Sequence, residues 1–134
     1  MDKSRKKELA RVWRGKNRAK CRTYSRKFYN QNKDRLSLDR KTPKYRYSRY
    51  KDSAKQRGIE FKLSFEQFLT FWNKVCHYCS NSIKGVGIDR IDNSKGYEID
   101  NCVPCCEWCN KMKLGHTQNE FFDQVKKICG QLKV

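Results

Sequence analysis

Apolar residues along this chain follow short helical and strand periods from about residue 45 onward. Residues 45–57 are predicted to form a helix that ends at Gly58, because glycine adopts the backbone conformation favoured just past a helix end. Residues 59–63 alternate apolar and polar side chains, which predicts a short strand with one buried face. Residues 64–67 fit a capping box, and the helix that they begin carries four apolar side chains: Phe65, Phe68, Leu69 and Trp72.

The pattern continues as a hairpin followed by two helices. Residues 86–92 are predicted as one strand, residues 93–96 as the turn, and a second extended segment runs toward Val103 and Pro104. A helix is expected from Cys106 to about Leu114, before Gly115. Residues 117–120 form a second capping box, and the last helix extends to Gly130 with a common apolar face of Phe121, Phe122, Val125 and Ile128. Short strands beside these helices predict an α+β domain.

The first 44 residues differ because charge outweighs apolar pattern there. Residues 1–57 hold 22 Lys or Arg and 5 Asp or Glu, a net charge of +17, whereas residues 58–134 hold 10 and 9, a net charge of +1. Residues 1–40 contain a single glycine and no proline, which allows helix, but too few apolar positions to bury that helix against a core. We therefore expect a basic helical arm over residues 1–44, mobile or ordered by a ligand, and a folded domain over residues 45–134.

So large a field of one sign attracts a polyanion, and nucleic acid is the leading partner. Lys and Arg of the arm would contact phosphates while Trp13 or Tyr24 stacks on bases; the alternative is a solvated basic tail. A membrane surface is the weaker partner. No run of about twenty apolar residues could span a bilayer, and the start of the chain lacks the apolar segment of a signal peptide. We expect an intracellular protein in a reducing compartment, the cytoplasm or nucleoid of a host cell.

Eight cysteines in a reducing compartment favour metal binding over disulfides. Cys21 and Cys129 are isolated, and the other six form three Cys-x-x-Cys pairs: Cys76 with Cys79, Cys102 with Cys105, and Cys106 with Cys109. Two such pairs about thirty residues apart can hold one zinc ion in tetrahedral geometry. The two adjacent pairs would crowd four ligands into eight residues, so we predict a structural zinc site made of Cys76, Cys79, Cys106 and Cys109. Cys102 and Cys105 are then expected to be small, partly buried side chains.

The motifs between and beyond these cysteines occur in a specific order: Cys76-x-x-Cys79, Ile88-Asp89-Arg90-Ile91-Asp92, Gly96-Tyr97, Asn101, and Cys106-x-x-Cys109-Asn110-x-x-Lys113. This order resembles the HNH nuclease family in its zinc-knuckled, phage and mobile-element form. The resemblance covers about residues 45–122 and leaves the arm outside. It implies a ββα-metal core, in which a two-stranded hairpin and a helix hold one divalent cation, usually Mg²⁺, with Mn²⁺ as the alternative.

The resemblance also implies roles for individual residues. Asp89 is similar to the first metal ligand of the family and Asn110 to the second, and carboxylate and amide oxygens suit Mg²⁺. Asn101 corresponds to the residue that ties down the loop beside the site. The alternatives are a carboxylate paired with a neighbouring cation for Asp89 and a helix-start cap for Asn110.

Arg90 departs from the family, which most often has His at this position as the general base. Arginine stays protonated, but its guanidinium can hold a phosphate through two parallel hydrogen bonds. The general base is therefore unassigned among His77, His116 and activation of water by the cation alone, and both histidines could equally be exposed or capping side chains. Lys113 is expected either to contact a backbone phosphate or to be solvated. Other nucleic-acid contacts are expected from four residues of the helix at 45–57: Arg46, Arg49, Lys55 and Arg57.

These features predict a metal-dependent endonuclease that hydrolyses DNA phosphodiester bonds and is held on DNA by its basic arm. The first alternative is a zinc-stabilised DNA- or RNA-binding module without catalysis, for which the missing His is the best evidence. The second is a basic assembly protein resembling ribosomal components that bind RNA through a zinc knuckle and extended arms. Cutting of one strand or of both, action as a monomer or an oligomer, and roles in homing, packaging, restriction or defence are all compatible with the pattern.

Overall fold

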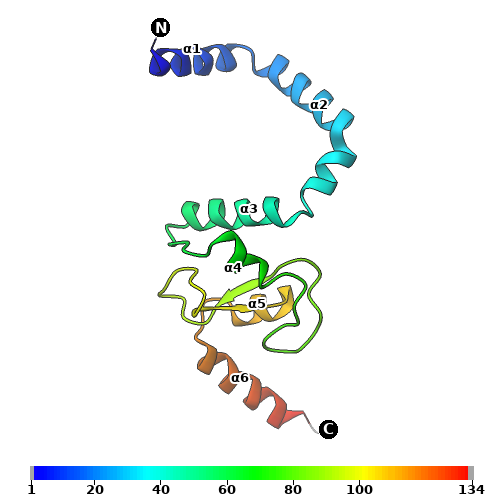
Figure 1. The fold of residues 1–134 in the computed structure, drawn as a ribbon, viewed down its shortest axis with the longest axis vertical. Helices are drawn as coiled ribbons and strands as arrows, with labels where there is room; N and C mark the ends of the chain where they lie inside the picture. The colour runs from blue at the N-terminus through cyan, green and yellow to red at the C-terminus, as the bar shows by residue number, and fades with distance from the viewer. Residues whose placement is uncertain (1, 133–134) are drawn as a thin grey trace. The chain divides into compact units, whose positions relative to one another are not determined.

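The computed structural model describes residues 2–132, and the chain divides into two units, one up to Asp39 and one from Arg40 onward. Its helices and its two-stranded hairpin confirm the predicted α+β class. In chain order the elements are α1 (Lys3–Lys16), α2 (Arg18–Asp39), α3 (Pro43–Gln56), α4 (Phe65–Leu69), β1 (Ile88–Arg90), β2 (Cys102–Pro104), α5 (Glu107–Lys113) and α6 (Gln118–Gln131) (Figure 1).

The first unit consists of α1 and α2, and neither helix contains a buried residue. The two helices are separated at Asn17, whose side-chain amide donates a hydrogen bond to the carbonyl oxygen of Trp13 at 2.9 Å. The α-helical hydrogen bonds of α2 begin directly after Asn17, because the N–H of Cys21 donates to the carbonyl oxygen of Asn17. The aromatic side chains Trp13, Tyr24 and Phe28 are exposed. This unit is therefore helical without a core of its own, as its scarcity of apolar residues predicts.

The second unit begins with α3, which starts at Pro43, two residues before the predicted start at Tyr45. The Thr42 side chain accepts a hydrogen bond from the N–H of Tyr45, and Pro43 occupies the first helical turn. Proline is well suited to this position, because the N–H that it lacks would have no partner inside the helix. Pro43 is thus part of the helix start. Gly58 follows the helix with φ +67°.

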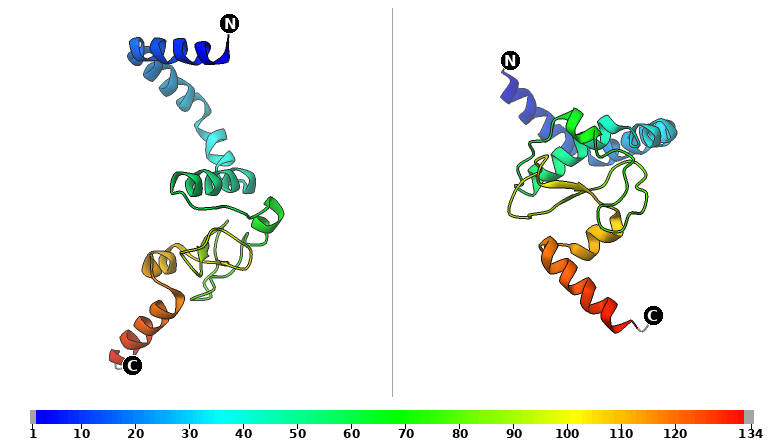
Figure 2. Two further views of the ribbon diagram at one scale, coloured as in Figure 1. Left: turned by 90° about the vertical axis from the view of Figure 1, so that its left-hand side faces the viewer. Right: turned by 60° about the horizontal axis from the view of Figure 1, so that its bottom comes forward.

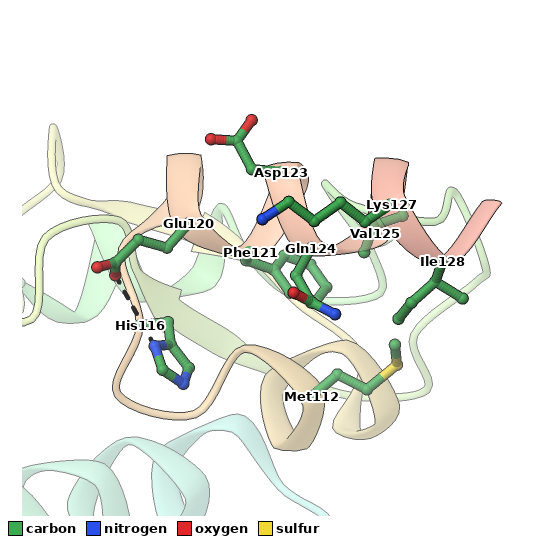
Figure 3. Close-up of a pocket in the computed structure, with 9 residues that line it drawn as sticks. All are labelled: Met112, His116, Glu120, Phe121, Asp123, Gln124, Val125, Lys127 and Ile128. Carbon is green, nitrogen blue, oxygen red and sulfur yellow. Dashed lines mark ion pairs between the residues drawn. The ribbon is translucent and has the colours of Figure 1, made fainter. Parts of the chain in front are cut away.

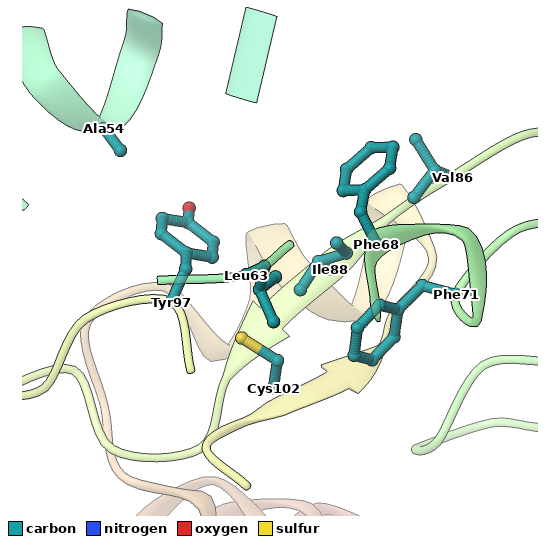
Figure 4. Packing of buried hydrophobic residues seen from close by; sticks show 8 residues of the cluster. All are labelled: Ala54, Leu63, Phe68, Phe71, Val86, Ile88, Tyr97 and Cys102. Carbon is teal, nitrogen blue, oxygen red and sulfur yellow. The ribbon is translucent and has the colours of Figure 1, made fainter. Parts of the chain in front are cut away.

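α3 and α4 pack on the hairpin and form the main core with it (Figure 4). The Tyr47 ring meets the Phe68 ring edge-on, with centroids 5.3 Å apart. Tyr50 links α3 to β1, because its hydroxyl accepts a hydrogen bond from the N–H of Ile88 at 3.2 Å. The buried members of this core are Ala54, Leu63, Phe68, Phe71, Val86, Ile88, Tyr97 and Cys102.

Residues 59–63 do not form the predicted strand. They make one isolated parallel bridge, between Phe61 and Tyr97. The N–H of Lys62 donates to the carbonyl oxygen of Tyr97, and the N–H of Tyr97 donates to the carbonyl oxygen of Glu60. The alternation of apolar and polar residues still buries Leu63, but pairing at a single residue is too short to extend into a ladder.

α4 ends at Leu69, three residues before its predicted end at Trp72. The N–H groups of residues 70–72 each donate to the carbonyl oxygen three residues earlier, which tightens the chain beyond the α-helix. Asn73 then takes a left-handed conformation with φ +51°, and its N–H donates to the carbonyl oxygen of Gly85 at 2.7 Å. The tighter bonding and this turn stop the helix.

The predicted hairpin is present, but both of its strands are short. β1 and β2 pair antiparallel, with Asp89 opposite Val103 and Arg90 opposite Cys102. Residues 91–101 connect them, a longer segment than the predicted turn at 93–96. This register brings Asp89 and Arg90 to the last positions of β1, directly before the loop.

Two glycines allow backbone segments to approach the hairpin closely. A Cβ atom at Gly87 would clash with the carbonyl oxygen of Cys105, and one at Gly96 would clash with the carbonyl oxygen of Glu60. The close approach of Cys105 to Gly87 lets the N–H of Cys105 donate to the carbonyl oxygen of Gly87 at 2.9 Å. Both glycines are therefore required by packing and not by an unusual backbone conformation.

α5 and α6 complete the unit (Figure 2). Cys106 occupies the N-cap position of α5, and its sulfur accepts a hydrogen bond from the N–H of Cys109. Both predicted capping boxes form, Ser64 with Gln67 before α4 and Thr117 with Glu120 before α6. α6 continues to Gln131, one residue beyond its predicted end. Among the residues that the structure describes, no helix is long and apolar enough to cross a membrane.

Candidate functional site

Four cysteines from two distant segments meet at one point beside the hairpin. The sulfur atoms of Cys76, Cys79, Cys106 and Cys109 all lie within 4.8 Å of one another, and those of Cys79 and Cys106 are 3.7 Å apart. Zn–S bonds of about 2.3 Å in tetrahedral geometry would separate two sulfurs by about 3.8 Å. The structure thus brings together the predicted four and leaves out Cys102 and Cys105, and the cluster is compatible with a structural zinc ion.

The turn at residues 76–80 presents backbone N–H groups to the first of these sulfurs. Burial raises the pKa of Cys76, but hydrogen bonding from the backbone of Cys106, Cys79 and Tyr78 outweighs burial and lowers the pKa to about 6. A thiolate is the form that binds zinc. The segment is fixed to the hairpin because the N–H of His77 donates to the carbonyl oxygen of Pro104 at 2.8 Å.

A cleft of about 270 Å³ lies where β1 meets α5, and it contains the three residues predicted to surround a cation and a phosphate: Asp89, Arg90 and Asn110. Asp89 and Arg90 come from the end of β1, and Asn110 comes from the second turn of α5. Asn110 directly follows Cys109, so the four-sulfur cluster fixes the helix that carries it. Arg57, Asn93, Tyr97 and Lys111 also line the cleft.

Asp89 is 4% exposed, and its carboxylate has two protein partners. The Tyr78 hydroxyl donates to Oδ2 at 2.7 Å, and Lys113 Nζ lies 3.2 Å from the same oxygen. Burial and the hydrogen bond to Asp89 both raise the pKa of Tyr78, so this hydroxyl stays protonated and acts as a donor. These contacts orient the carboxylate at the rim of the cleft.

Lys113 corrects the sequence-based expectation of a phosphate contact or a solvated side chain. Its side chain is fully buried, and Nζ also donates to the carbonyl oxygen of Arg90 at 3.0 Å. A buried ammonium is stable only when it is paired and hydrogen-bonded, and Asp89 and the Arg90 carbonyl supply both. Lys113 therefore stabilises the end of β1 from the protein interior and is not a surface cation.

Arg90 is held by the loop that follows β1. Its Nη1 donates to the carbonyl oxygens of Asn93 and Lys95, and its guanidinium lies over the Tyr97 ring, 5.4 Å from the ring centroid. The side chain is half-buried and lines the cleft. These contacts fix the guanidinium while leaving N–H groups unused by the protein, because arginine carries five donors.

Comparison with known proteins identifies the fold. No family model matches the chain. Over 70 residues the chain is 44% identical to "Uncharacterized protein R423" of Acanthamoeba polyphaga mimivirus, an alignment that covers 51% of this chain and 13% of that protein. Over 136 aligned positions it is 23% identical to the "SPbeta prophage-derived putative HNH endonuclease YoqL" of Bacillus subtilis strain 168, covering 92% of this chain and 49% of that protein. The chain thus spans about half or less of these relatives.

Among solved structures, the rare-cutting HNH restriction endonuclease PacI is similar, with a TM-score of 0.52 and 20% sequence identity over 61% of this chain and 72% of that one. The chain therefore has an HNH-like fold. A likeness at this level of identity concerns the fold, so it assigns neither activity nor substrate.

Within this HNH fold, Asn101 binds the loop between the strands. Its side chain is buried, its oxygen accepts from the N–H of Asp92 at 3.0 Å, and its amide donates to the carbonyl oxygens of Asp92 and Gly96, each at 3.0 Å. Three backbone groups of one loop therefore depend on a single side chain. Because Arg90 and Tyr97 flank this loop, Asn101 acts on the cleft through the backbone.

Neither histidine lies at the HNH cleft. His77 is exposed and its ring packs edge-on against the Tyr78 ring. His116 Nδ1 lies 3.8 Å from Glu120 Oε2. The His116 side chain lines a larger hollow of about 620 Å³ between α5 and α6, to which α5 contributes Met112 and α6 contributes Ile128 (Figure 3). Neither described histidine thus lines the cleft that contains Asp89.

The four cations predicted on α3 are divided between two sides of that helix. Arg57 lines the cleft itself, and Arg46 and Arg49 line an adjacent hollow, whereas Lys55 lines neither. Two residues that contact the candidate site were not predicted from the sequence as part of it: Tyr78, which donates to Asp89, and Tyr97, whose ring lies under Arg90. Tyr97 belongs to the Gly-Tyr pair of the family motif, which was a usable signal, whereas nothing local marks Tyr78 as a partner of Asp89.

Proposed function

We propose that the protein is a metal-dependent endonuclease that hydrolyses DNA phosphodiester bonds. The supporting observation is the cleft that joins Asp89, Arg90 and Asn110 directly beside the four-sulfur cluster, within an HNH fold. DNA as the substrate follows from the likeness to the restriction endonuclease PacI and from the formal charge of +18.

In this proposal Asp89 and Asn110 hold a divalent cation through a carboxylate and an amide oxygen, a donor set that suits Mg²⁺ or Mn²⁺. When bound, the cation supplies charge stabilisation to the phosphate and the leaving oxygen. Tyr78 and Lys113 orient the Asp89 carboxylate. Arg90 binds a non-bridging phosphate oxygen with the N–H groups that the loop leaves unused. The four cysteines would hold zinc, which would fix α5, and with it Asn110, against β1.

The basic arm is proposed to provide affinity for the DNA backbone. α1 and α2 contain no buried residue, so their many Lys and Arg side chains lie on the surface, where they can contact a polyanion. Each phosphate neutralised on duplex DNA contributes about 0.9 to the slope of log affinity against log salt. Affinity should therefore fall steeply between 50 and 200 mM salt, by roughly 1,000-fold or more if six or more phosphates are contacted. A flat salt response would contradict this role.

The test is nicking of supercoiled plasmid with Mg²⁺ or Mn²⁺, comparing the wild type with Asp89→Ala and Asn110→Ala. Both variants should lose cleavage while retaining DNA binding. Asn110 is exposed, so its replacement leaves the core intact, whereas Asp89→Asn serves as a second variant that keeps the shape of the buried side chain. Asp100→Ala, an exposed carboxylate outside the cleft, is the control and should cleave normally.

A second candidate is a zinc-stabilised nucleic-acid-binding module without catalysis. Two observations favour it: the Asp89 carboxylate is already engaged by Tyr78 and Lys113, and no described histidine reaches the cleft. The same assay separates the two functions. Absence of cleavage by the wild type with every divalent metal, together with normal DNA binding, supports the module and rejects the endonuclease.

A further inference from the structure

The six cations of α3 and its C-terminal cap are sorted by residue type onto two faces. With about 100° between successive residues of an α-helix, the arginines fall within roughly 80° of one another and the lysines fall on the opposite side. The arginines are Arg46, Arg49 and Arg57, and the lysines are Lys44, Lys51 and Lys55. Arginine presents a planar fork that matches phosphate, whereas lysine is a strongly hydrated point charge. The two faces are therefore chemically different.

The arginine face continues into the HNH cleft. A hollow of about 280 Å³ is lined by Arg46, Arg49 and Arg57 together with Tyr97, and the cleft that contains Asp89 is also lined by Arg57 and Tyr97. The two hollows thus meet at these two side chains. The hollow along α3 has no acidic residue in its lining, which is otherwise Tyr50 and Ser53.

Tyr97 contacts both Arg57 and Arg90 at the place where the two hollows meet. Its hydroxyl accepts a hydrogen bond from Arg57 Nη2 at 2.9 Å, and Arg90 lies over its ring. Arg57 Nε also donates to the carbonyl oxygen of Ser53 at 3.3 Å, which leaves three of its five donors for a ligand. Arg46 is held more weakly, 3.5 Å from the carbonyl oxygen of Val86. Side chains fixed in this way lose little conformational entropy on binding.

We propose that one strand of the DNA backbone leaves the cleft across Tyr97 and runs along the arginine face of α3, where Arg57, Arg49 and Arg46 each bind one of its phosphates. From Arg46 to Arg57 the helix rises roughly 16 Å, a length that spans about five base pairs along the axis of duplex DNA at 3.4 Å each. We call Arg46, Arg49 and Arg57 the arginine track. That the track leads to a cation site at Asp89 and Asn110 rests on the proposed function. The track assigns no contact to Lys55.

The experiment compares two variants of the full-length, zinc-loaded chain that remove equal charge. One replaces Arg46, Arg49 and Arg57 with alanine, and the other replaces Lys44, Lys51 and Lys55 with alanine. Binding to a mixed-sequence DNA duplex is measured by fluorescence anisotropy between 50 and 200 mM salt, without Mg²⁺. Zinc content and the melting temperature are measured for both, and the single variants replace either triple variant whose melting temperature falls.

The arginine variant should lower the slope of log affinity against log salt by about 2.7, which is about 0.9 for each of three lost phosphate contacts. Its loss of affinity between 50 and 200 mM salt should then be roughly 40-fold smaller than that of the wild type. The lysine variant should change the slope by less than about one. Equal slopes for the two variants would overturn the track. Plasmid nicking separates this result from the proposed function. A wild type that nicks while both variants bind alike rejects the track alone, and a wild type that never nicks while only the arginine variant loses slope rejects the endonuclease alone.

Discussion

Lys113 Nζ lies 3.2 Å from Asp89 Oδ2, and both side chains are buried. The residue proposed to bind a cation therefore already faces a positive charge supplied by the fold. Lys113 comes from the last turn of α5 and Asp89 from the middle of β1, so the pair also ties the helix to the strand. Stability and the electrostatics of the cleft depend on the same contact.

We predict that Lys113→Ala lowers the free energy of unfolding by about 3–5 kcal/mol, because it leaves the Asp89 carboxylate buried without its cation. Denaturant unfolding of the zinc-loaded protein measures this. Lys111→Ala, on the same helix, removes an exposed pair with Glu107 and should leave the unfolding midpoint nearly unchanged. Asp89→Asn combined with Lys113→Met should recover part of the loss, since no unpaired charge remains. Equal midpoints for the two single variants would contradict the role of the buried pair.

The contrast between predicted and observed elements has a physical pattern. Local signals were sufficient where neighbours in sequence complete the structure. The capping boxes at Ser64 and Thr117 formed because each needs only a side chain three residues away. The cysteine spacing identified all four sulfurs of the cluster, because each Cys-x-x-Cys pair is a local signal and the two adjacent pairs are too close in sequence to share one ion.

Long-range contacts could not be predicted in the same way. The burial of Lys113 depends on Asp89, 24 residues away, and a lysine on a short helix is usually exposed. Tyr97 receives its hydrogen bond from Arg57 across 40 residues. The strand expected at residues 59–63 is reduced to one bridge with Tyr97, because the partner segment enters a turn at residues 99–101. Each miss reflects tertiary packing overriding a correct local pattern.

The second prediction concerns the four-sulfur cluster. Purified protein should contain about one zinc ion per chain, and Cys109→Ala should abolish zinc binding and unfold the second unit, since zinc supplies folding energy in such sites. Metal analysis by mass spectrometry and circular dichroism would measure both effects. Cys21→Ser and Cys129→Ser lie outside the cluster and should retain zinc. Loss of zinc in these controls would show that the metal is bound elsewhere.

The third prediction concerns pH. Burial in the core is the main cause that raises the pKa of Cys102, to about 11. Because the folded-state pKa lies above that of an unfolded thiol, about 8.5, the protonated thiol stabilises the fold below pH 8.5, and this contribution is lost as pH rises toward 11. Wild type and Cys102→Ala should therefore converge in unfolding free energy over that range. At pH 8, the exposed Cys129 should react with iodoacetamide while the buried Cys102 does not. Equal reaction rates for the two thiols would contradict the burial of Cys102.

A fourth prediction tests the close approach at Gly87. Gly87→Ala places a methyl group against the carbonyl oxygen of Cys105, and the required backbone shift should cost about 1–3 kcal/mol of unfolding free energy. Since Cys105 directly precedes Cys106, the shift should also weaken zinc binding in a competition with a chelator. Gly115→Ala meets no atom within 4 Å and is the matched control. A stable Gly87→Ala variant with normal zinc affinity would rule out the tight contact.

The last prediction addresses how Asn101 acts on the cleft. Asn101→Asp keeps the shape of the side chain but replaces the amide donor with an oxygen that faces the carbonyl oxygens of Asp92 and Gly96. Two hydrogen bonds become two repulsive contacts, so the loop that carries Arg90's partners should open. Amide hydrogen exchange should accelerate at residues 92–97 while α3 keeps its protection, and DNA cleavage should fall with zinc content unchanged. An equal rise in exchange across α3 would instead indicate global unfolding, and normal exchange with reduced cleavage would mean that Asn101 contacts the DNA directly.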